Sequence, residues 1–349
     1  MITDPYGLSR VLDEPGVMPQ QARRLDPSRT LRPGEILVDV ETLAIDAASF
    51  RQLAEDSHYD AATLGRRVAN IVRERGKMHN PVTGSGGMLI GTVLEVSGSH
   101  PDAARLPTGT RIASLVSLTL TPLQLDAIRG VDLNADRVDV RGHAILFASG
   151  AYTVLPSDLP GSIVLAALDV CGAPALVARY ARPGMRVAVI GAGKSGALCL
   201  AQARRSVGSD GSLVAIDVSV SALDALRNAA LCDIALRVDA TQSVDVLQAI
   251  STATRGQLCD LVVNCASVAN TEMATILSTR DRGTALFFSM TTNFAAATLG
   301  AEGVSRDIQL IMGNGYSAGH AELTLGLLRS HSALRTLFEA RYLRTGTSI

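Results

Sequence analysis

Three glycines in the middle of the chain, Gly191, Gly193 and Gly196, have the G-x-G-x-x-G spacing of a turn that holds a dinucleotide pyrophosphate. The first glycine permits a tight turn, the second lets the backbone approach the phosphates, and the third lets helix and strand pack closely. The N-terminus of the following helix would direct unpaired N–H groups and the positive end of its dipole towards the phosphates. Lys194 and Ser195 lie within this turn, so both are expected cofactor-binding residues.

The residues on either side of the turn fit this interpretation. Val187–Ile190 is an apolar run typical of a buried parallel strand, and a helical pattern begins after the turn. A P-loop is the alternative, because a lysine and a serine follow a glycine here. That motif needs a further glycine where Ala188 stands, so we reject it. Lys194 would then contact the pyrophosphate or be a solvated residue of the first helical turn.

A carboxylate ends the second apolar run, Ser212–Asp217, near the spacing expected for a ribose-binding acid. Asp217 would accept hydrogen bonds from both ribose hydroxyls of the adenosine half. It would repel a 2′-phosphate, and Val218 and Ser219 supply no arginine to bind one. The sequence therefore predicts NAD rather than NADP, with an aspartate of a surface turn as the alternative.

Helical and strand patterns continue to alternate after this point. The expected strands and helices cover residues 221–229 (helix), 233–238 (strand), 243–254 (helix), 260–265 (strand), 270–277 (helix) and 284–289 (strand). Repeated βα units predict a doubly wound parallel sheet with helices on both faces. Cofactors bind at the carboxyl ends of such strands, although ordinary loop positions there are the alternative. This edge adds four expected cofactor-binding residues: Cys265, Ala266, Ser289 and Met290.

The first half of the chain is predicted to be rich in β-structure. Strands are expected at Glu35–Ile45, Leu89–Val96 and Arg111–Leu120, with glycines and prolines between them. One charged helical stretch, Ala61–Arg75, interrupts them.

Composition excludes several classes of protein. The chain has 349 residues, of which 47% are hydrophobic, enough for two domains. A formal net charge of −1 gives no electrostatic reason to expect nucleic acid or a membrane surface as a partner. No apolar run is long enough to span a bilayer, and no signal peptide is expected. Five cysteines without a C-x-x-C pair indicate reduced thiols and a cytoplasmic location.

Two runs in the β-rich half, Val93–Gly98 and Pro107–Ala113, resemble the G-x-V-x-x-V-G…G-D-R-V pattern of the medium-chain dehydrogenase/reductase superfamily. The resemblance implies an α/β protein with an N-terminal chaperonin-10-like β-barrel domain, a Rossmann domain with a doubly wound parallel sheet, and a C-terminal segment returning to the barrel. The implied catalytic domain is 1–158 and 304–349, and the implied NAD-binding domain is 159–303. Members commonly dimerise through the sheet edge of the nucleotide domain, so a homodimer is expected.

Longer runs resemble one family in this superfamily, the L-erythro-3,5-diaminohexanoate dehydrogenases. The resemblance implies NAD-dependent oxidative deamination of this diamino acid at C3, giving 5-amino-3-oxohexanoate, ammonium and NADH in lysine breakdown. Its small diamino acid substrate is then the expected partner. The runs that carry the resemblance are residues 41–50, 75–93, 115–122 and 313–322.

No metal site is expected. Many medium-chain dehydrogenases hold a catalytic zinc with a cysteine after the first long strand and with a Gly-His-Glu segment. The corresponding positions here are Asp46-Ala47-Ala48-Ser49 and Gly86-Gly87-Met88. A neutral amine can expel hydride without a Lewis acid, which suits a metal-free site.

The chemistry implied by this family needs a group that exchanges protons near neutral pH, because the C3 ammonium must be deprotonated and water must then be activated. Histidine does this without a shifted pKa. We predict that His79 handles the amine proton, that Lys77 anchors the substrate carboxylate or activates water, and that Asn80 orients either. Residues of a surface loop or a packed strand edge are the alternative for all three.

The second ammonium of the substrate, at C5, should meet a carboxylate. Asp46, Asp169 and Glu302 lie in segments that would face the interdomain cleft in this superfamily, and Asp46 is the preferred candidate. A cap at the end of a strand is its alternative role. In the return segment with His320, Tyr316 would donate to the substrate carboxylate.

Two other functions remain open. The first is a zinc-independent medium-chain reductase that acts on a quinone or an enoyl substrate. Such reductases usually use NADPH, so Asp217 argues against this function. The second is an NAD-binding protein without catalytic activity. The fold alone does not separate these possibilities.

Overall fold

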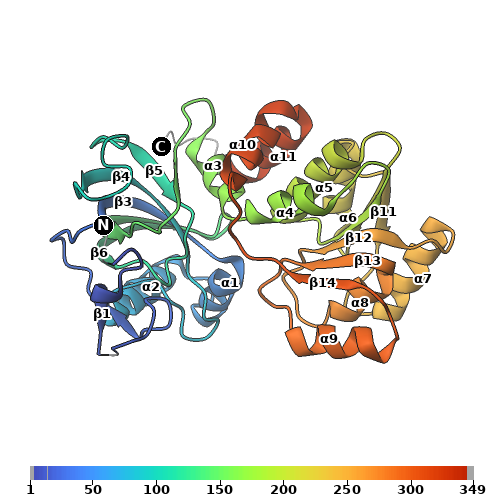
Figure 1. Ribbon diagram of the computed structural model, residues 1–349, viewed down its shortest axis with the longest axis horizontal. Coiled ribbons are helices and arrows are strands. Elements are labelled where there is room, and N and C mark those ends of the chain that lie inside the picture. The colour runs from blue at the N-terminus through green and yellow to red at the C-terminus, as the bar shows by residue number, and fades with distance from the viewer. Residues whose placement is uncertain (1–3, 14, 344–349) are drawn as a thin grey trace. The chain divides into compact units, whose positions relative to one another are not determined.

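The chain divides into two units in the computed structural model, which describes residues 4–13 and 15–343. The first unit ends at Leu165 and the second begins at Ala166. The first is built mainly from antiparallel strands, and the second alternates strands with helices (Figure 1).

A six-stranded antiparallel sheet forms the frame of the first unit, in the order β6-β7-β3-β4-β5-β8. Strand β3 lies at its centre, and its apolar residues Ile36, Val38 and Leu43 enter a buried core with Leu89 and others. The expected strands 35–45 and 89–96 are present as β3 and β4. The strands are β3 (Ile36–Ile45), β4 (Gly87–Val96), β5 (Arg111–Ser114), β6 (Leu123–Asp132), β7 (Arg137–Leu146) and β8 (Tyr152–Val154).

The expected strand Arg111–Leu120 is less than half as long as predicted, with four residues. It ends at Ser114, because the next residues turn: Leu120 N–H donates to the Ser117 carbonyl, and the Ser117 hydroxyl accepts from Thr119 N–H at 3.2 Å. Strands β6 and β7, which form a hairpin at the sheet edge, were not predicted.

Two helices pack within the first unit, α1 (Ala47–Asp56) and α2 (Ala61–Arg75). The bounds of α2 agree with the prediction. Its buried residues Leu64, Val68 and Val72 recur at every fourth position, which places one apolar stripe against the hairpin strand β6. The short elements before β3 are a 3-10 helix (Leu8–Arg10), β1 (Val11–Leu12) and β2 (Arg24–Leu25).

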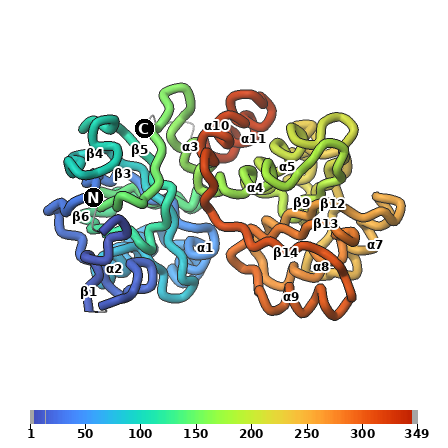
Figure 2. The backbone as a smooth tube through the Cα atoms, viewed as in Figure 1, coloured from blue at the N-terminus to red at the C-terminus, as the bar shows by residue number. Residues whose placement is uncertain are grey.

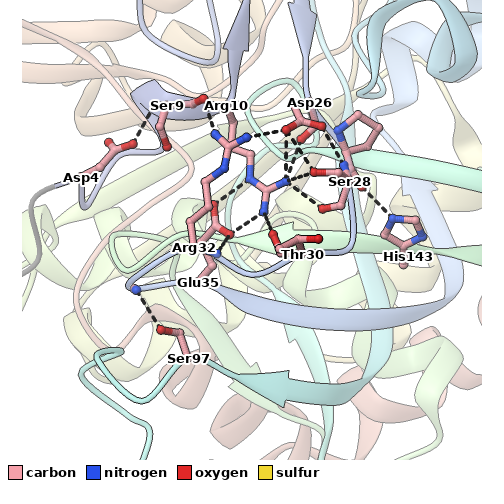
Figure 3. Close-up of polar contacts among 12 residues, drawn as sticks. Asp4, Ser9, Arg10, Asp26, Ser28, Thr30, Arg32, Glu35, Ser97 and His143 are labelled. Atoms are coloured by element: carbon pink, nitrogen blue, oxygen red, sulfur yellow. Dashed lines mark hydrogen bonds and ion pairs between the residues drawn. The ribbon is translucent and has the colours of Figure 1, made fainter.

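Arg10 is completely buried and lies at the centre of a polar network in the first unit (Figure 3). Its Nε and Nη2 donate to the two carboxylate oxygens of Glu35 at 2.8 and 2.5 Å. Its remaining N–H groups reach the carbonyls of Asp26, Ser28 and Thr30 and the Ser28 hydroxyl. This bidentate pair fixes the segment that precedes β3.

Substitution of Arg10 by methionine should destabilise the protein by about 3–5 kcal/mol, because it leaves a buried carboxylate without its cation. Glu35 is only 3% exposed and would keep a single backbone donor, the N–H of Arg32 at 2.7 Å. Urea denaturation followed by circular dichroism measures the loss.

The matched control is Arg24→Met, because Arg24 pairs with Asp13 at the surface, where the two side chains are 49% and 61% exposed. An exposed pair contributes about 1 kcal/mol or less. Equal losses in the two variants would contradict the importance of the buried network.

All six strands of the second unit are parallel, in the order β11-β10-β9-β12-β13-β14. This order reverses direction next to β9, as in a Rossmann fold. In Figure 1, α5 and α6 lie on one side of the sheet and α8 and α9 on the other. The strands are β9 (Arg186–Ile190), β10 (Ser212–Asp217), β11 (Ile234–Arg237), β12 (Cys259–Asn264), β13 (Thr279–Phe287) and β14 (Gln309–Met312).

The helices of the second unit follow the strands in the predicted alternation. Those expected at 221–229, 243–254 and 270–277 are present within two residues. The helices are α4 (Gly172–Tyr180), α5 (Lys194–Val207), α6 (Val220–Asn228), α7 (Ser243–Thr254), α8 (Glu272–Ser278), α9 (Phe294–Gly303), α10 (His320–Ser330) and α11 (Ser332–Tyr342). A further helix, α3 (Gly161–Leu168), spans the division between the units.

The last part of the chain groups with the second unit, which differs from the predicted return of residues 304–349 to the barrel domain. Figure 2 shows the chain running from β14 to α10 and α11. Helix α10 contacts α4 and α5, and its Leu325 and Leu328 are buried. The division also falls after residue 165 rather than 158. Residues 344–349 lie outside the described part.

No single helix of the described residues has the length and apolar character to cross a membrane. The bent pair α3 and α4 passes that test only when the two helices are joined.

Candidate functional site

The glycine turn follows β9 directly. Gly191 has φ +99°, and a Cβ there would lie 3.0 Å from the Ala266 nitrogen and the Cys265 carbonyl carbon. A Cβ on Gly196 would lie 1.9 Å from the Gly191 oxygen, so only glycine lets α5 approach the turn. A Cβ on Gly193 would meet nothing within 4 Å. The space beside Gly193 is therefore where a ligand can approach the backbone.

Helix α5 begins immediately after Gly193. Gly193 is the N-cap and makes no side-chain hydrogen bond to the helix. The first N–H groups of α5 therefore lack a side-chain acceptor from the cap, and they carry the positive end of the helix dipole. Ser195 and Gly196 are buried in this first turn. The arrangement fits a pyrophosphate held by backbone N–H groups.

Asp217, the last residue of β10, lies beside the glycine turn. Its Oδ2 accepts from the Ala192 N–H at 2.6 Å, and its Oδ1 accepts from the Ser219 N–H at 2.8 Å. The side chain is half-buried at the carboxyl end of the sheet. The structure therefore brings the predicted ribose-binding carboxylate and the predicted phosphate-binding turn together.

The strand ends next to β9 complete this edge. Asn264, at the end of β12, is in register with Ile190 of β9 and with Phe287 of β13. Cys265 follows, and its N–H donates to the Ile190 carbonyl at 2.8 Å. Cys265 and Ala266 therefore border the turn as predicted.

Ser289 and Met290 follow β13 on the same edge. The Ser289 hydroxyl bonds Thr291 Oγ1 at 2.7 Å, and Met290 is 77% exposed. Neither residue contacts the glycine turn through a hydrogen bond that the described structure records. Their cofactor-binding role remains a prediction.

Asn264 is a positioning residue that the sequence analysis missed. It is completely buried; its Nδ2 donates to Thr271 Oγ1 and Thr275 Oγ1, and its Oδ1 accepts from Ala266 N–H. It therefore fixes the loop after β12. The available signal was an asparagine directly after the apolar run Leu261–Val263.

Lys194 is neither solvated nor isolated. Its Nζ lies 2.6 Å from Asp169 Oδ2, and the two side chains are 16% and 7% exposed. This ion pair contradicts the suggestion that Asp169 awaits a substrate ammonium, because a cation of the chain already neutralises its carboxylate. It also joins the residues preceding α4 to the start of α5.

The predicted substrate-binding role of Lys77 is wrong. Lys77 is completely buried, and its Nζ donates to the carbonyls of Pro19 and Gln20 at 2.7 and 2.9 Å. An ammonium buried in this way ties the 19–20 turn to the residues after α2. It is not exposed to a substrate carboxylate or to water.

Asn80 organises a loop. Its Nδ2 donates to Gln52 Oε1 at 2.8 Å, its Oδ1 accepts from Val82 N–H at 2.9 Å, and its backbone bonds Ser85 and Gly84. The residue is completely buried. Its contacts hold the loop that follows His79. The hydrogen bonds of Asn80 described here do not reach Lys77, which is one of the two residues that Asn80 was predicted to orient.

His79 lies on that loop and is half-buried. Its Nδ1 is buried and has no hydrogen-bond partner among the described residues. Burial lowers the pKa of His79 below its usual 6.5, and the cations of Lys77 and Arg75 lower it further. The imidazole is therefore neutral at neutral pH and able to accept a proton.

Asp46 and a group of hydroxyls border the same loop. Asp46 Oδ2 accepts from Gly86 N–H at 2.9 Å. Ser49, in the first turn of α1, bonds Ser85 Oγ at 2.5 Å and also the hydroxyl of Thr83. Asp46 therefore joins the end of β3 to the start of β4 through this hydrogen bond. Its predicted contact with the C5 ammonium of the substrate stays a prediction.

The remaining predicted residues lie in the second unit. Tyr316 is 54% exposed, and its ring packs edge-on against His320 at 5.1 Å between centroids. His320 is buried, and burial lowers its pKa. Glu302 is exposed on α9. Nothing in the contacts of Tyr316 or Glu302 assigns them a ligand.

Within residues 4–13 and 15–343, no three His, Cys, Asp or Glu side chains converge closely enough to hold a metal ion.

Two curated proteins are similar to the chain over nearly its whole length. One, from Acetoanaerobium sticklandii, is 44% identical over 97% of this chain and 98% of its own. The other, from Fusobacterium nucleatum subsp. nucleatum, is 46% identical over the same shares. Both are named L-erythro-3,5-diaminohexanoate dehydrogenase. A family model described as the N-terminal domain of that dehydrogenase matches residues 9–156.

Solved structures with the same fold are more distant. An alcohol dehydrogenase from Thermotoga maritima superposes with a TM-score of 0.56 at 17% identity, covering 89% of this chain and 86% of its own. A mycobacterial protein in complex with NADPH gives 0.58 at 15% identity, covering 93% and 94%. These identities establish the fold alone, which is the predicted fold of medium-chain dehydrogenases and reductases.

Proposed function

This chain belongs to the L-erythro-3,5-diaminohexanoate dehydrogenase family, and from that premise we propose that it oxidatively deaminates L-erythro-3,5-diaminohexanoate at C3 with NAD. The products are 5-amino-3-oxohexanoate, ammonium and NADH, a step of lysine breakdown. The similarity to two dehydrogenases of that name over nearly the full chain carries the proposal.

The nucleotide turn supports a nicotinamide dinucleotide as cofactor. Gly191, Gly193 and the N–H groups of Lys194, Ser195 and Gly196 would hold the pyrophosphate. Asp217 would accept from the ribose hydroxyls, exchanging its present bond to Ala192 N–H for them. Its charge supports NAD over NADP, because a 2′-phosphate beside a carboxylate would be repelled. When bound, NAD supplies the hydride acceptor.

Asp217→Ala should raise the KM for NAD by about tenfold or more, since hydrogen bonds to a charged group contribute about 1.5–3 kcal/mol. The maximal rate should change far less, because the ribose is remote from the reacting carbon. Initial rates over a range of NAD and NADP concentrations measure both quantities.

Asp239→Ala is the matched control, because Asp239 is an exposed aspartate of the same unit that bonds only within its own turn to Thr241. Its KM for NAD should match that of the wild type. An Asp217 variant with unchanged KM would remove this residue from the cofactor site.

We assign proton transfer to His79. A neutral imidazole accepts the proton of the C3 ammonium, which leaves the amine lone pair free to assist loss of hydride from C3. The imidazolium then releases this proton to solvent, and the neutral imidazole takes a proton from the water that attacks the resulting iminium carbon. The buried, unpartnered Nδ1 and the lowered pKa support this role.

The C5 ammonium of the substrate needs a negatively charged partner, and its carboxylate needs a hydrogen-bond donor. We propose that Asp46 receives the C5 ammonium, because its carboxylate lies at the end of β3 next to the His79 loop. Tyr316 remains our candidate donor to the substrate carboxylate, since its hydroxyl-bearing side chain is exposed. Asn80 takes part by holding the loop of His79 in place.

The direct test is a turnover assay. The protein is incubated with NAD and L-erythro-3,5-diaminohexanoate, and NADH is followed by its absorbance while ammonium is measured in parallel. Equal amounts of NADH and ammonium are expected. Absence of turnover in a protein that binds NADH would overturn the substrate and leave the cofactor in place.

We also propose a homodimer formed through β14. This strand is at the edge of the described sheet, and Met312 in it is exposed. Phe294 and Leu299, on the neighbouring helix α9, are 67% and 66% exposed. An exposed apolar sheet edge is a site for pairing with another strand. Light scattering of the purified protein should give twice the mass of one chain.

A further inference from the structure

Two cysteine thiols touch beneath the glycine turn. Cys199 lies in α5, Cys265 follows β12, and their Sγ atoms are 3.9 Å apart. A disulfide has an S–S length of about 2.05 Å, so the sulfurs need to approach by roughly 2 Å. Cys265 lies in the loop that follows β12, whereas Cys199 is inside a helix.

Both residues are attached to the elements that form the nucleotide turn. Helix α5, which carries Cys199, begins at Lys194 next to Gly193. The backbone of Cys265 bonds the Ile190 carbonyl, and its carbonyl carbon lies 3.0 Å from where a Cβ of Gly191 would be. A covalent bond between the two sulfurs would therefore join both sides of the turn.

The two thiols differ in exposure. Cys265 is half-buried at the rim of the sheet, where a small oxidant can reach it. Cys199 is completely buried, and burial raises its pKa well above the usual value for a thiol. Because a peroxide must reach the sulfur, the more exposed Cys265 is the first to be oxidised and Cys199 is the partner that resolves it.

We propose that Cys199 and Cys265 form a redox modification site beneath the nucleotide turn, in which a hydroperoxide converts the two thiols into a disulfide and weakens NADH binding. The effect on NADH rests on the proposed cofactor site. The formation of the disulfide does not.

The chemistry balances in two steps. The Cys265 sulfur attacks one oxygen of hydrogen peroxide; the O–O bond breaks, sulfenic acid forms and one water leaves. The Cys199 sulfur then attacks the Cys265 sulfur; the S–S bond forms, the S–O bond breaks, and the hydroxyl leaves as water with the Cys199 proton. Peroxide is reduced, and the two thiols are oxidised by two electrons.

The disulfide should weaken NADH binding because it pulls the loop after β12 towards α5. Cys265 and Ala266 already lie close to Gly191, because a Cβ on Gly191 would be 3.0 Å from the backbone of each. A shift of this loop moves N–H groups of the turn away from the phosphates. Loss of one hydrogen bond to a charged phosphate weakens binding by about tenfold.

The experiment uses the full chain with stoichiometric hydrogen peroxide. Peptide mapping without reductant should find the Cys199 and Cys265 peptides cross-linked. The mass of the cross-linked species should be that of the two reduced peptides together, less two hydrogens. Fluorescence titration should give a Kd for NADH about tenfold above that of the reduced protein. Dithiothreitol should restore the original Kd, and NADH added beforehand should slow the cross-link.

Variants separate this site from the other cysteines. In Cys199→Ser, dimedone should label Cys265 after peroxide, because no thiol resolves the sulfenic acid; Cys199→Ala serves the same purpose if the serine variant is unstable. Cys232→Ser is the matched control, because Cys232 is also half-buried but lies before β11. It should behave as the wild type.

Two results would overturn the proposal: no Cys199–Cys265 cross-link in the oxidised wild type, or a complete cross-link that leaves the Kd for NADH unchanged. If the reduced protein does not bind NADH at all, the proposed cofactor site fails, while the peptide map still decides whether the disulfide forms.

Discussion

Substitution of His79 by alanine should lower kcat for the diamino acid by about two orders of magnitude or more, which is the usual scale for loss of a general base. The loss should appear in kcat because the imidazole acts on the reacting amine and on the attacking water. The KM for NAD should stay close to the wild-type value, since the residues that we assign to the cofactor belong to the second unit and His79 to the first.

The pH profile gives a second measure of the same group. Above its pKa the imidazole is neutral and accepts a proton; below it, the imidazolium cannot. Because burial and the cations of Lys77 and Arg75 lower the pKa of His79 from 6.5, kcat/KM should remain high at pH 6.5 and fall only at lower pH. This acid limb should disappear from the residual activity of the alanine variant.

The control for this prediction is His58→Ala, because His58 is an exposed histidine of the same unit. Its kcat and its pH profile should match those of the wild type. Near-normal turnover in His79→Ala would remove His79 from the mechanism, whatever the outcome for His58.

The variants Gly196→Ala and Gly193→Ala should differ in which property they lose: Gly196→Ala should lose thermal stability and NADH binding, and Gly193→Ala should lose NADH binding alone. At Gly196 the new Cβ would lie 1.9 Å from the backbone oxygen of Gly191, and neither backbone can retreat without separating α5 from β9. Such overpacking costs about 1–3 kcal/mol or more, so the melting temperature should fall. Binding of NADH should be lost with it.

At Gly193 the new Cβ would meet no atom of the protein within 4 Å, and φ is −75°, which alanine adopts freely. The melting temperature of Gly193→Ala should therefore equal that of the wild type. Its affinity for NADH should nevertheless fall, because the added methyl group occupies the space through which the pyrophosphate approaches the backbone. Thermal melting and NADH fluorescence, measured on both variants, separate the two effects. Normal NADH binding by Gly193→Ala would place the phosphates elsewhere.

The second unit was largely predictable because its signals are local. A buried parallel strand is a short apolar run, and a glycine turn has a fixed spacing, so β10 and α7 occur at the expected residues. The hairpin of β6 and β7 gave no such signal. Most residues of β6 are partly or fully exposed at the sheet edge, and polar and apolar residues are mixed along it.

The first unit shows where this reasoning stops. Lys77, His79 and Asn80 are neighbours in sequence and look alike as candidates for chemistry. What distinguishes them is contact with distant segments: Lys77 bonds carbonyls at 19 and 20, and Asn80 bonds Gln52. Burial of this kind is decided by tertiary packing, which the order of residues along the chain does not display.

The contacts of the two lysine side chains have a practical consequence. Lys77 and Lys194 are the only lysines among the 32 basic residues of the chain, and each is bonded inside its own unit. Amine-directed reagents such as succinimidyl esters should therefore modify the folded protein almost solely at its α-amino group. A fluorophore or an immobilisation linker can then be attached at one position, far along the chain from the nucleotide turn, without mutagenesis.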